Sequence, residues 1–260
     1  MNVFTWDEIL TVLNTGKSLP FFDGGCGISI GSFDGCHKGH RKLLSLLIEK
    51  CNEKKSKDKN FKSGVISFSR PLPSIKHSDD YSGDITTLNQ RLETFEKLGL
   101  DFAIIVDFDD EFASMMGTDF LNLLRNICNM EVLAEGIDFR CGFKGATDSQ
   151  AIKYWAQKNS VECIFVDSVY YQDSFGNEER ISSSYIRKMI QKGFFKVASE
   201  MLSSPYEYDI QTAREKNKST QILPPDGIYH PLSENNEDTR IEIKERKIIN
   251  LPLCNRLKFL

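Results

Sequence analysis

The stretch GSFDGCHKGH, residues 31–40, decides the fold of this chain. It follows the short apolar run Gly27–Ile30 and opens an amphipathic segment that begins at Lys38. This pattern predicts a strand, a glycine-containing turn and the start of a helix. In such an arrangement backbone N–H groups and the positive end of the helix dipole lie together, which favours binding of an anion such as a phosphate. His37 and His40 are three residues apart, so both rings are expected on one face of the first helical turn.

Two imidazoles beside a phosphate-binding turn indicate charge stabilisation in phosphoryl or nucleotidyl transfer. Gly39 lies between the two histidines and is expected to let a ligand approach the backbone closely. A lone histidine at a helix start is usually a solvated or capping residue, but two at this spacing after a strand and a turn favour function. Asp34 either orients a histidine or fixes the turn, and the sequence leaves both readings open.

Composition sets broad limits on partners and location. The chain has 260 residues, 40% of them hydrophobic, and a formal net charge of −4, which gives no electrostatic argument for nucleic acid or an anionic membrane. The first ten residues lack the basic and apolar regions of a signal peptide, and no apolar run approaches the length of a membrane span. The seven cysteines form no C-x-x-C pair, so we expect reduced thiols in a cytoplasmic protein without a protein-bound metal.

Strands and helices alternate along most of the chain, and the strands are nearly continuous apolar runs. This pattern predicts an α/β fold with a parallel sheet covered by helices on both faces, with ligands at the carboxyl ends of the strands. We predict strands at Gly27–Gly31, Gly64–Phe68, Phe102–Phe108, Glu131–Glu135 and Val161–Asp167. We predict helices from a Thr5–Glu8 capping box to about Asn14, and at His37–Cys51, Leu88–Leu98, Thr118–Cys128, Asp148–Lys158, Ser183–Gln191 and Phe194–Leu202.

The composition changes after Pro205, where the chain becomes more polar. We predict a first domain over residues 1–205 and a short β-rich tail over residues 206–260, which is too short for a large independent core.

A second informative stretch, RISSSYIR, spans residues 180–187. The serines are good helix caps, and capping alone is a sufficient explanation for them. However, Arg187 follows Ser183 by four residues and Ser184 by three, so the guanidinium and both hydroxyls are expected on one helix face. Such a helix start suits a polyphosphate, and together with the first motif it predicts two anion-binding helix starts.

Two further stretches lie between these motifs. FSRPLP, residues 68–73, is a strand end that enters a proline-containing loop, and EGIDFRCGFKG, residues 135–145, contains a Gly-x-Asp-Phe turn. Each is a weak signal alone. In this order, over roughly residues 25–205, the motifs resemble those of the FMN adenylyltransferase module of the bacterial FAD synthetases, which are bifunctional riboflavin kinase/FMN adenylyltransferases. A T-x-L-x-x-R-L helix at residues 86–92 adds to the resemblance.

The resemblance implies a Rossmann-like nucleotidyltransferase that transfers AMP from ATP to FMN, giving FAD and pyrophosphate. It implies Mg²⁺ carried mainly by the substrate phosphates, ATP and FMN as small-molecule partners, and flavoproteins as clients for FAD. Carried onto this chain, it implies the catalytic residues His37, His40 and Arg187. It implies ATP contacts at Gly31, Phe33, Asp34, Gly39, Ser183 and Ser184, and FMN contacts at Phe68, Pro71, Leu72, Pro73, Asp138 and Arg180.

The chain departs from the family pattern at three places. Leu72 stands where the flavin-side loop usually has histidine, and Cys141 replaces a common aromatic residue. The G-x-P-T-A-N signature of the kinase module is absent, and only Leu223–Tyr229 resembles a later strand of that module. We therefore expect a tail that is a remnant of the kinase barrel, and no riboflavin phosphorylation.

Two other functions remain open on the sequence alone. One is a nucleotidyltransferase for a different phosphate acceptor, such as phosphopantetheine, nicotinamide mononucleotide or a cytidylyl acceptor. The other is a flavin- or nucleotide-binding relic without catalysis.

Overall fold

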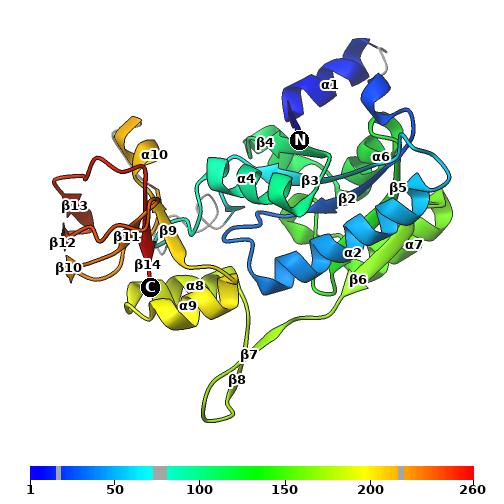
Figure 1. Cartoon of the computed structure of the whole chain (residues 1–260). Helices are drawn as coiled ribbons and strands as arrows, with labels where there is room; N and C mark the ends of the chain where they lie inside the picture. The colour runs from blue at the N-terminus through cyan, green and yellow to red at the C-terminus, as the bar shows by residue number, and fades with distance from the viewer. Residues whose placement is uncertain (16–18, 73–80, 216–219) are drawn as a thin grey trace. The chain divides into compact units, whose positions relative to one another are not determined.

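A computed structural model describes residues 1–15, 19–72, 81–215 and 220–260 of the chain (Figure 1). Within these ranges six strands form a parallel sheet in the order β1-β4-β3-β2-β5-β6. Its strands are β1 (Asn2–Thr5), β2 (Cys26–Ile30), β3 (Lys62–Phe68), β4 (Phe102–Val106), β5 (Met130–Gly136) and β6 (Glu162–Val166). The predicted parallel α/β sheet is therefore confirmed.

The helices follow the predicted order closely. They are α1 (Trp6–Thr15), α2 (Lys38–Lys55), α4 (Leu88–Leu98), α5 (Asp110–Ser114), α6 (Gly117–Ile127), α7 (Ser149–Asn159), α8 (Ser183–Gln191), α9 (Phe195–Leu202) and α10 (Ile210–Glu215), with short 3-10 turns at Pro20–Phe22 and Phe143–Gly145. The capping box of α1 is confirmed, since the Thr5 N–H donates to Glu8 Oε2 at 2.7 Å and the Glu8 N–H donates to Thr5 Oγ1 at 3.3 Å.

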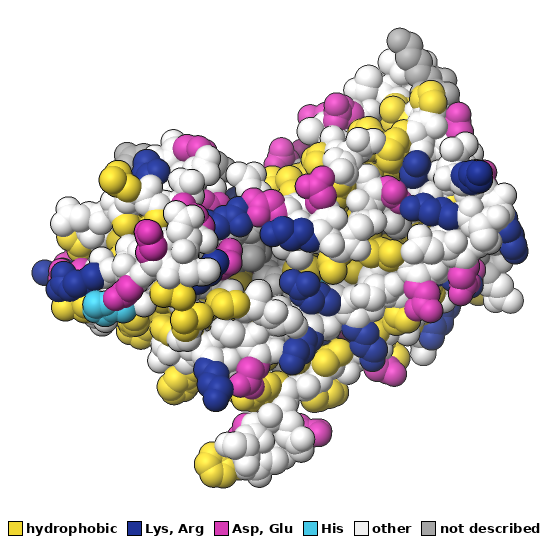
Figure 2. Space-filling model, viewed as in Figure 1, with side chains coloured by type: hydrophobic (Ala, Val, Ile, Leu, Met, Phe, Trp, Pro, Cys, Tyr) yellow, Lys and Arg dark blue, Asp and Glu magenta, His cyan; other side chains and the backbone are white. Residues whose placement is uncertain are grey.

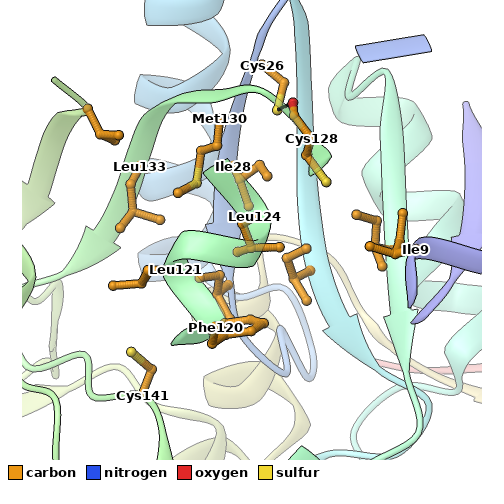
Figure 3. Close-up of a cluster of buried hydrophobic side chains, with 14 of the residues drawn as sticks. Ile9, Cys26, Ile28, Phe120, Leu121, Leu124, Cys128, Met130, Leu133 and Cys141 are labelled. Carbon is orange, nitrogen blue, oxygen red and sulfur yellow. Dashed lines mark hydrogen bonds between the residues drawn. The ribbon is translucent and has the colours of Figure 1, made fainter. Parts of the chain in front are cut away.

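Helices cover both faces of the sheet. On one face, apolar side chains of the strands pack with α1, α6 and α7 in a single buried cluster. Figure 3 shows part of this cluster, where Leu121 and Leu124 of α6 lie near Ile28 of β2 and Leu133 of β5. On the other face α2 packs so tightly that a Cβ on Gly27 would lie 2.4 Å from the Cys51 sulfur. This double burial explains why the central strands β2, β3, β4 and β5 are largely apolar.

The described residues group into two compact units. The first comprises Met1–Ser32, His40–Leu72 and Thr94–Ser168, and the second comprises Phe33–Gly39, Pro73–Glu93 and Val169–Leu260. The sheet belongs to the first unit, whereas α8, α9 and the C-terminal tail belong to the second. The proposed domain boundary at residue 205 stays a prediction.

The second unit has its own hydrophobic core. Residues from α8, α9 and the tail strands share it, among them Ile186, Met201, Tyr206, Leu257 and Phe259. Among the described tail residues, two small antiparallel sheets form, in the orders β10-β12-β13 and β11-β14-β9. Their strands are β9 (Tyr206–Asp209), β10 (Gly227–Tyr229), β11 (Leu232–Ser233), β12 (Ile241–Lys244), β13 (Lys247–Ile249) and β14 (Arg256–Phe259). The expected β-rich tail is thus confirmed.

Several elements were absent from the sequence predictions, namely the short helices α5 and α10, the edge strand β1 and a hairpin of two short strands. The edge strand β1 pairs in parallel with β4, from Asn2 opposite Phe102 to Thr5 opposite Ile105. The hairpin of β7 (Tyr170–Gln172) and β8 (Glu178–Arg180) projects from the second unit, and Figure 2 shows a hydrophobic group at its tip, where Phe175 is 89% exposed. These strands are three or four residues long, too short for hydrophobic alternation to mark them.

Of the described helices, none is both long enough and apolar enough to cross a membrane.

Candidate functional site

The turn that follows β2 is tightly wound and buried. Phe33, Gly35 and Cys36 all have positive φ angles, of 48°, 78° and 38°. Glycine suits the middle position, because L side chains rarely adopt a φ of 78° and a Cβ on Gly35 would crowd Leu202 Cδ2 at 2.9 Å and Ile85 Cγ2 at 3.0 Å. The sequence motif therefore encodes a strained turn of fixed shape.

Asp34 holds this turn in place. Its carboxylate accepts hydrogen bonds from the Ile85 N–H at 3.0 Å, the Thr86 N–H at 2.9 Å and the Thr86 hydroxyl at 3.1 Å, and it is 1% exposed. The Gly35 N–H donates in turn to the Thr86 hydroxyl at 2.9 Å. Of the two roles left open by the sequence, the structure thus supports fixing of the turn.

The second motif meets the first motif at Asp34. The Ser183 hydroxyl donates to the Asp34 carbonyl oxygen at 2.8 Å, and Arg187 Nη2 lies 2.5 Å from the Asp34 carboxylate. Ser182 caps α8 by accepting from the Tyr185 N–H at 3.2 Å, so the capping reading is also correct. Ser184 is exposed, and its hydroxyl does not share the buried surroundings of Arg187.

Arg187 is almost fully buried in this cluster. Its Nε donates to the Gly83 carbonyl at 2.9 Å, and its guanidinium carbon lies 5.0 Å from the centre of the Tyr81 ring. Its side chain is 7% exposed, compared with 1% for Asp34, so the ion pair is shielded from water. Among the described residues these contacts occupy the Nε and Nη2 atoms, which leaves Nη1 as the end that could meet a ligand.

His37 is buried at the end of the same turn, immediately before α2. Burial lowers its pKa to about 4, although the nearby Asp34 carboxylate raises the pKa and Arg180 lowers it further. The imidazole is therefore neutral near pH 7 in the free protein. Gly39 accommodates this ring, because a Cβ there would lie 3.2 Å from two of its atoms. The space beside Gly39 is thus taken by His37 itself.

The segment that carries Ile85 and Thr86 is fastened to the C-terminal tail. The Asp84 N–H donates to the Thr220 carbonyl at 2.7 Å, and the Ile222 N–H donates to the Asp84 carbonyl at 2.8 Å. The Gln221 side-chain amide donates to the Ile85 carbonyl at 2.9 Å and accepts from the Asp209 N–H at 2.7 Å. The tail therefore supports the residues that hold Asp34.

Several predicted residues lie in the first unit. Gly31 donates its N–H to the Ile66 carbonyl at 3.0 Å, and His40 is the third residue of α2 and is half-buried. Phe68 is 4% exposed and packs edge-on against Phe108 and Phe112, within the aromatic part of the core.

The predicted flavin-side residues lie in different surroundings. Pro71 is buried, and Leu72 packs partly against the core and donates its N–H to the Ser32 hydroxyl at 3.1 Å. Asp138 is exposed in the turn after β5, and Arg180 is exposed at the end of β8 in the second unit. Pro73 lies outside the described residues.

Cys141, the residue that departs from the family pattern, is buried beside Thr147. Burial raises the pKa of its thiol to about 12, and the nearby Glu135 raises it further, so the thiolate is disfavoured.

Sequence reasoning missed three residues that contact Asp34 or its partners: Thr86 binds Asp34, Tyr81 lies against Arg187, and Gln221 binds Ile85. Thr86 begins the T-x-L-x-x-R-L stretch, so the motif marked the right segment without showing that its backbone amides bind a carboxylate. Tyr81 and Gln221 lie in no motif, and no signal in the sequence pointed to them.

Comparison with known proteins places the two motifs in one family. The sequence profile of the family described as FAD synthetase matches residues 21–185. The chain belongs to the FAD synthetase family. The matched range includes the 31–40 turn, the 68–73 loop and the start of the second motif.

Relatives named bifunctional riboflavin kinase/FMN adenylyltransferase share about a quarter to a third of their residues with this FAD synthetase family member. The protein of Escherichia coli K12 is 30% identical over 183 residues, which are 70% of this chain and 55% of that protein. The Bacillus subtilis 168 protein is 27% identical over 225 residues, 80% of this chain and 67% of that protein. The Buchnera aphidicola (Schizaphis graminum) protein is 27% identical, and the match covers 73% of this chain and 58% of that protein. The chain thus spans little more than half to two thirds of these relatives.

A solved structure from Streptococcus pneumoniae, titled as a macrolide-efflux protein, has the same fold. The two structures superimpose with a TM-score of 0.71 at 19% sequence identity. The match covers 100% of this chain and 90% of the Streptococcus pneumoniae chain. This likeness shows the fold alone.

Proposed function

We propose that the protein is an FMN adenylyltransferase, which transfers AMP from ATP to FMN and releases pyrophosphate. One observation carries most of this proposal: Asp34 of the first motif binds both Ser183 and Arg187 of the second. Two motifs that are far apart in the sequence are thereby joined at one buried residue, Ser183 through the Asp34 carbonyl and Arg187 through the Asp34 carboxylate. Family membership supports the same reaction.

In the proposed reaction, an FMN phosphate oxygen attacks the α-phosphorus of ATP. The new P–O bond forms as the bond to the leaving pyrophosphate breaks, and the pyrophosphate keeps the electron pair. The FMN phosphate is already ionised near pH 7, so the reaction needs no strong general base. Its barrier arises from alignment of two polyanions and from charge that grows on the α-phosphate and the leaving group, and fixed donors lower that barrier.

We assign His37 and His40 to the α-phosphate. Because burial keeps the His37 imidazole neutral in the free protein, it would act as a hydrogen-bond donor rather than as a fixed cation. Ser183, Ser184 and the Nη1 end of Arg187 are assigned to the β- and γ-phosphates. Gly31, Phe33, Asp34 and Gly39 would act by shaping the turn that presents these donors.

For the flavin side we assign Phe68, Pro71, Leu72, Pro73, Asp138 and Arg180. The burial of Phe68 in the aromatic core makes it a support for the loop rather than a direct contact. An aliphatic Leu72 in place of an imidazole removes a polar contact, so we expect weaker FMN binding than in relatives that have histidine there.

Magnesium would be carried mainly by the nucleotide phosphates, where it neutralises charge. The described part of the chain holds no cluster of three or more His, Cys, Asp or Glu side chains that could form a metal site of its own. We further propose a cytoplasmic protein that supplies FAD to flavoproteins, with residues 1–205 as the transferase domain. The tail would then be a remnant of a kinase barrel that does not phosphorylate riboflavin.

The test is incubation of the purified chain with magnesium and ATP and with either FMN or riboflavin, followed by chromatographic separation of the flavins. We expect FAD from FMN and no product from riboflavin. FMN formed from riboflavin would contradict the loss of the kinase. Binding of ATP and FMN without pyrophosphate release would favour the non-catalytic alternative, and turnover with another phosphate acceptor alone would favour a different transferase.

A further inference from the structure

Glu135 is a buried carboxyl group to which the proposed reaction assigns no role. It is the sixth residue of β5 and is 1% exposed, in a strand whose neighbouring residues Val132, Leu133 and Ala134 are apolar and buried. Burial removes a carboxyl group from water at a cost, so such a strand position normally carries an apolar side chain. A buried carboxyl group at this position is therefore expected to have a hydrogen-bond partner.

That partner is the backbone of the neighbouring strand β2. The Ile30 N–H donates to Glu135 Oε1 at 2.7 Å. The register between β2 and β5 runs only as far as Ile28 opposite Leu133, so Ile30 lies beyond the last paired residues. Gly31, the next residue, donates to Ile66 of β3 on the opposite side of β2. The Glu135 side chain thus supplies the acceptor on the β5 side where the two strands separate.

The position of this bond in the sheet links it to the candidate site. Strands β3, β4 and β1 extend in one direction from β2, whereas β5 and β6 extend in the other, so β2 and β5 flank the switch in strand order. Parallel α/β sheets bind ligands outside the carboxyl ends of the strands at such a switch. Ile30 is the last residue of β2, and the GSFDGCHKGH turn begins at the next residue.

Burial disfavours the charged form of this carboxyl group. Burial raises the pKa of Glu135 well above its ordinary value, and the hydrogen bond from Ile30 lowers it by a smaller amount. Glutamine has the same length and keeps an oxygen that can accept the Ile30 N–H, which makes it the informative replacement.

We propose that Glu135 is a positioning residue for the transferase site, because its bond to Ile30 fixes the point from which the histidine-bearing turn leaves the sheet. The expected effect on kcat rests on the proposed function. The expected protection of the Ile30 amide at the end of β2 is independent of that function.

The test compares three variants of the full chain. Glu135→Gln keeps an acceptor oxygen, and Glu135→Met has similar length without one. Glu131→Met is the matched control, because Glu131 lies at the other end of β5 and pairs with Lys54 at 2.9 Å on the partly exposed surface. For each variant, kcat and the KM values for ATP and FMN are measured well below its melting temperature, and hydrogen exchange of the Ile30 amide is followed by mass spectrometry of short peptides.

We expect Glu135→Met to lower kcat at least tenfold with KM values within about threefold, and to speed exchange of the Ile30 amide at least tenfold. Glu135→Gln and the control are expected within threefold of wild type in both measurements. A Glu135→Met variant with wild-type kcat and wild-type exchange would overturn the proposal. So would a Glu135→Gln variant as impaired as Glu135→Met, since acceptance of a hydrogen bond would then not be the feature that matters. A wild-type chain that makes no FAD refutes the proposed function, and in that case the exchange measurement alone decides the role of Glu135.

Discussion

The buried pair of Asp34 and Arg187 leads to the sharpest prediction. Replacing Asp34 with asparagine keeps the shape of the side chain but removes its charge. The side chain then has one acceptor oxygen in place of two, and its new NH₂ group faces donors from Ile85, Thr86 and Arg187. The guanidinium, 7% exposed, stays in a protein environment without a counter-charge.

The magnitude follows from this geometry. Removal of one partner from a buried ion pair typically costs about 3–5 kcal/mol, because the remaining charge is left uncompensated. We therefore expect Asp34→Asn to lower the free energy of unfolding by about 3–5 kcal/mol, a large part of the ~5–15 kcal/mol that stabilises a typical domain. Urea unfolding followed by circular dichroism measures the change, with Asp110→Asn, an exposed acid at the start of α5, as the control.

A double variant separates the loss of the pair from the loss of the other contacts. When Asp34→Asn is combined with Arg187→Met no charge of the pair remains buried. We therefore expect Arg187→Met to cost much less in the Asp34→Asn background than alone, a coupling of about 1–3 kcal/mol. The reasoning is refuted if Asp34→Asn unfolds within about 1 kcal/mol of wild type, or if the two substitutions are additive.

Three other predictions concern the histidines and the support of the site. His40→Ala should lower the rate of FAD formation about a hundredfold or more while the unfolding transition stays unchanged, and near-normal turnover would remove His40 from catalysis. Burial lowers the pKa of His37 from 6.5 to about 4. Between these two pH values His37 is protonated in the unfolded chain but not in the folded chain. The free energy of unfolding therefore decreases as the pH falls from 6.5 towards 4. At pH 5 the free energy of unfolding is lower by about 2 kcal/mol for this reason. Urea unfolding at pH 7 and pH 5 should therefore show a smaller decrease in the free energy of unfolding for His37→Gln than for wild type. Equal decreases would contradict the burial argument. Gln221→Leu leaves the Ile85 carbonyl without its donor and should cost about 2–3 kcal/mol in thermal or urea unfolding, whereas an unchanged transition would show that the tail does not support the 84–90 segment.

Local sequence signals were sufficient for most of the elements. The Thr5–Glu8 capping box, the helix over Leu88–Leu98 and the helix over Ser183–Gln191 appear as predicted, because caps and apolar periodicity act within a few residues. The apolar strands of the sheet were equally clear. The sequence motifs also marked Asp34, Ser183 and Arg187 as candidate site residues, and the structure brings these three into contact.

Local signals failed where a partner is distant in the sequence. The short strand β1 is defined only by β4, about a hundred residues later. The hairpin of β7 and β8 has strands of three residues with exposed side chains, so it carries no periodic pattern. Thr86 and Gln221 became visible only through their contacts with Asp34 and Ile85.

The sequence by itself determined most of the strands and helices, the buried character of the central strands and the two stretches to which we assign the chemistry. Only the tertiary structure decided that Asp34 joins those stretches and that Glu135 completes the end of β2. The physical reason is that caps, turns and periodicity depend on neighbouring residues, whereas a buried carboxyl group takes its partners from whichever segments the packed chain brings to it. For Asp34 and Arg187 those partners are 153 residues apart.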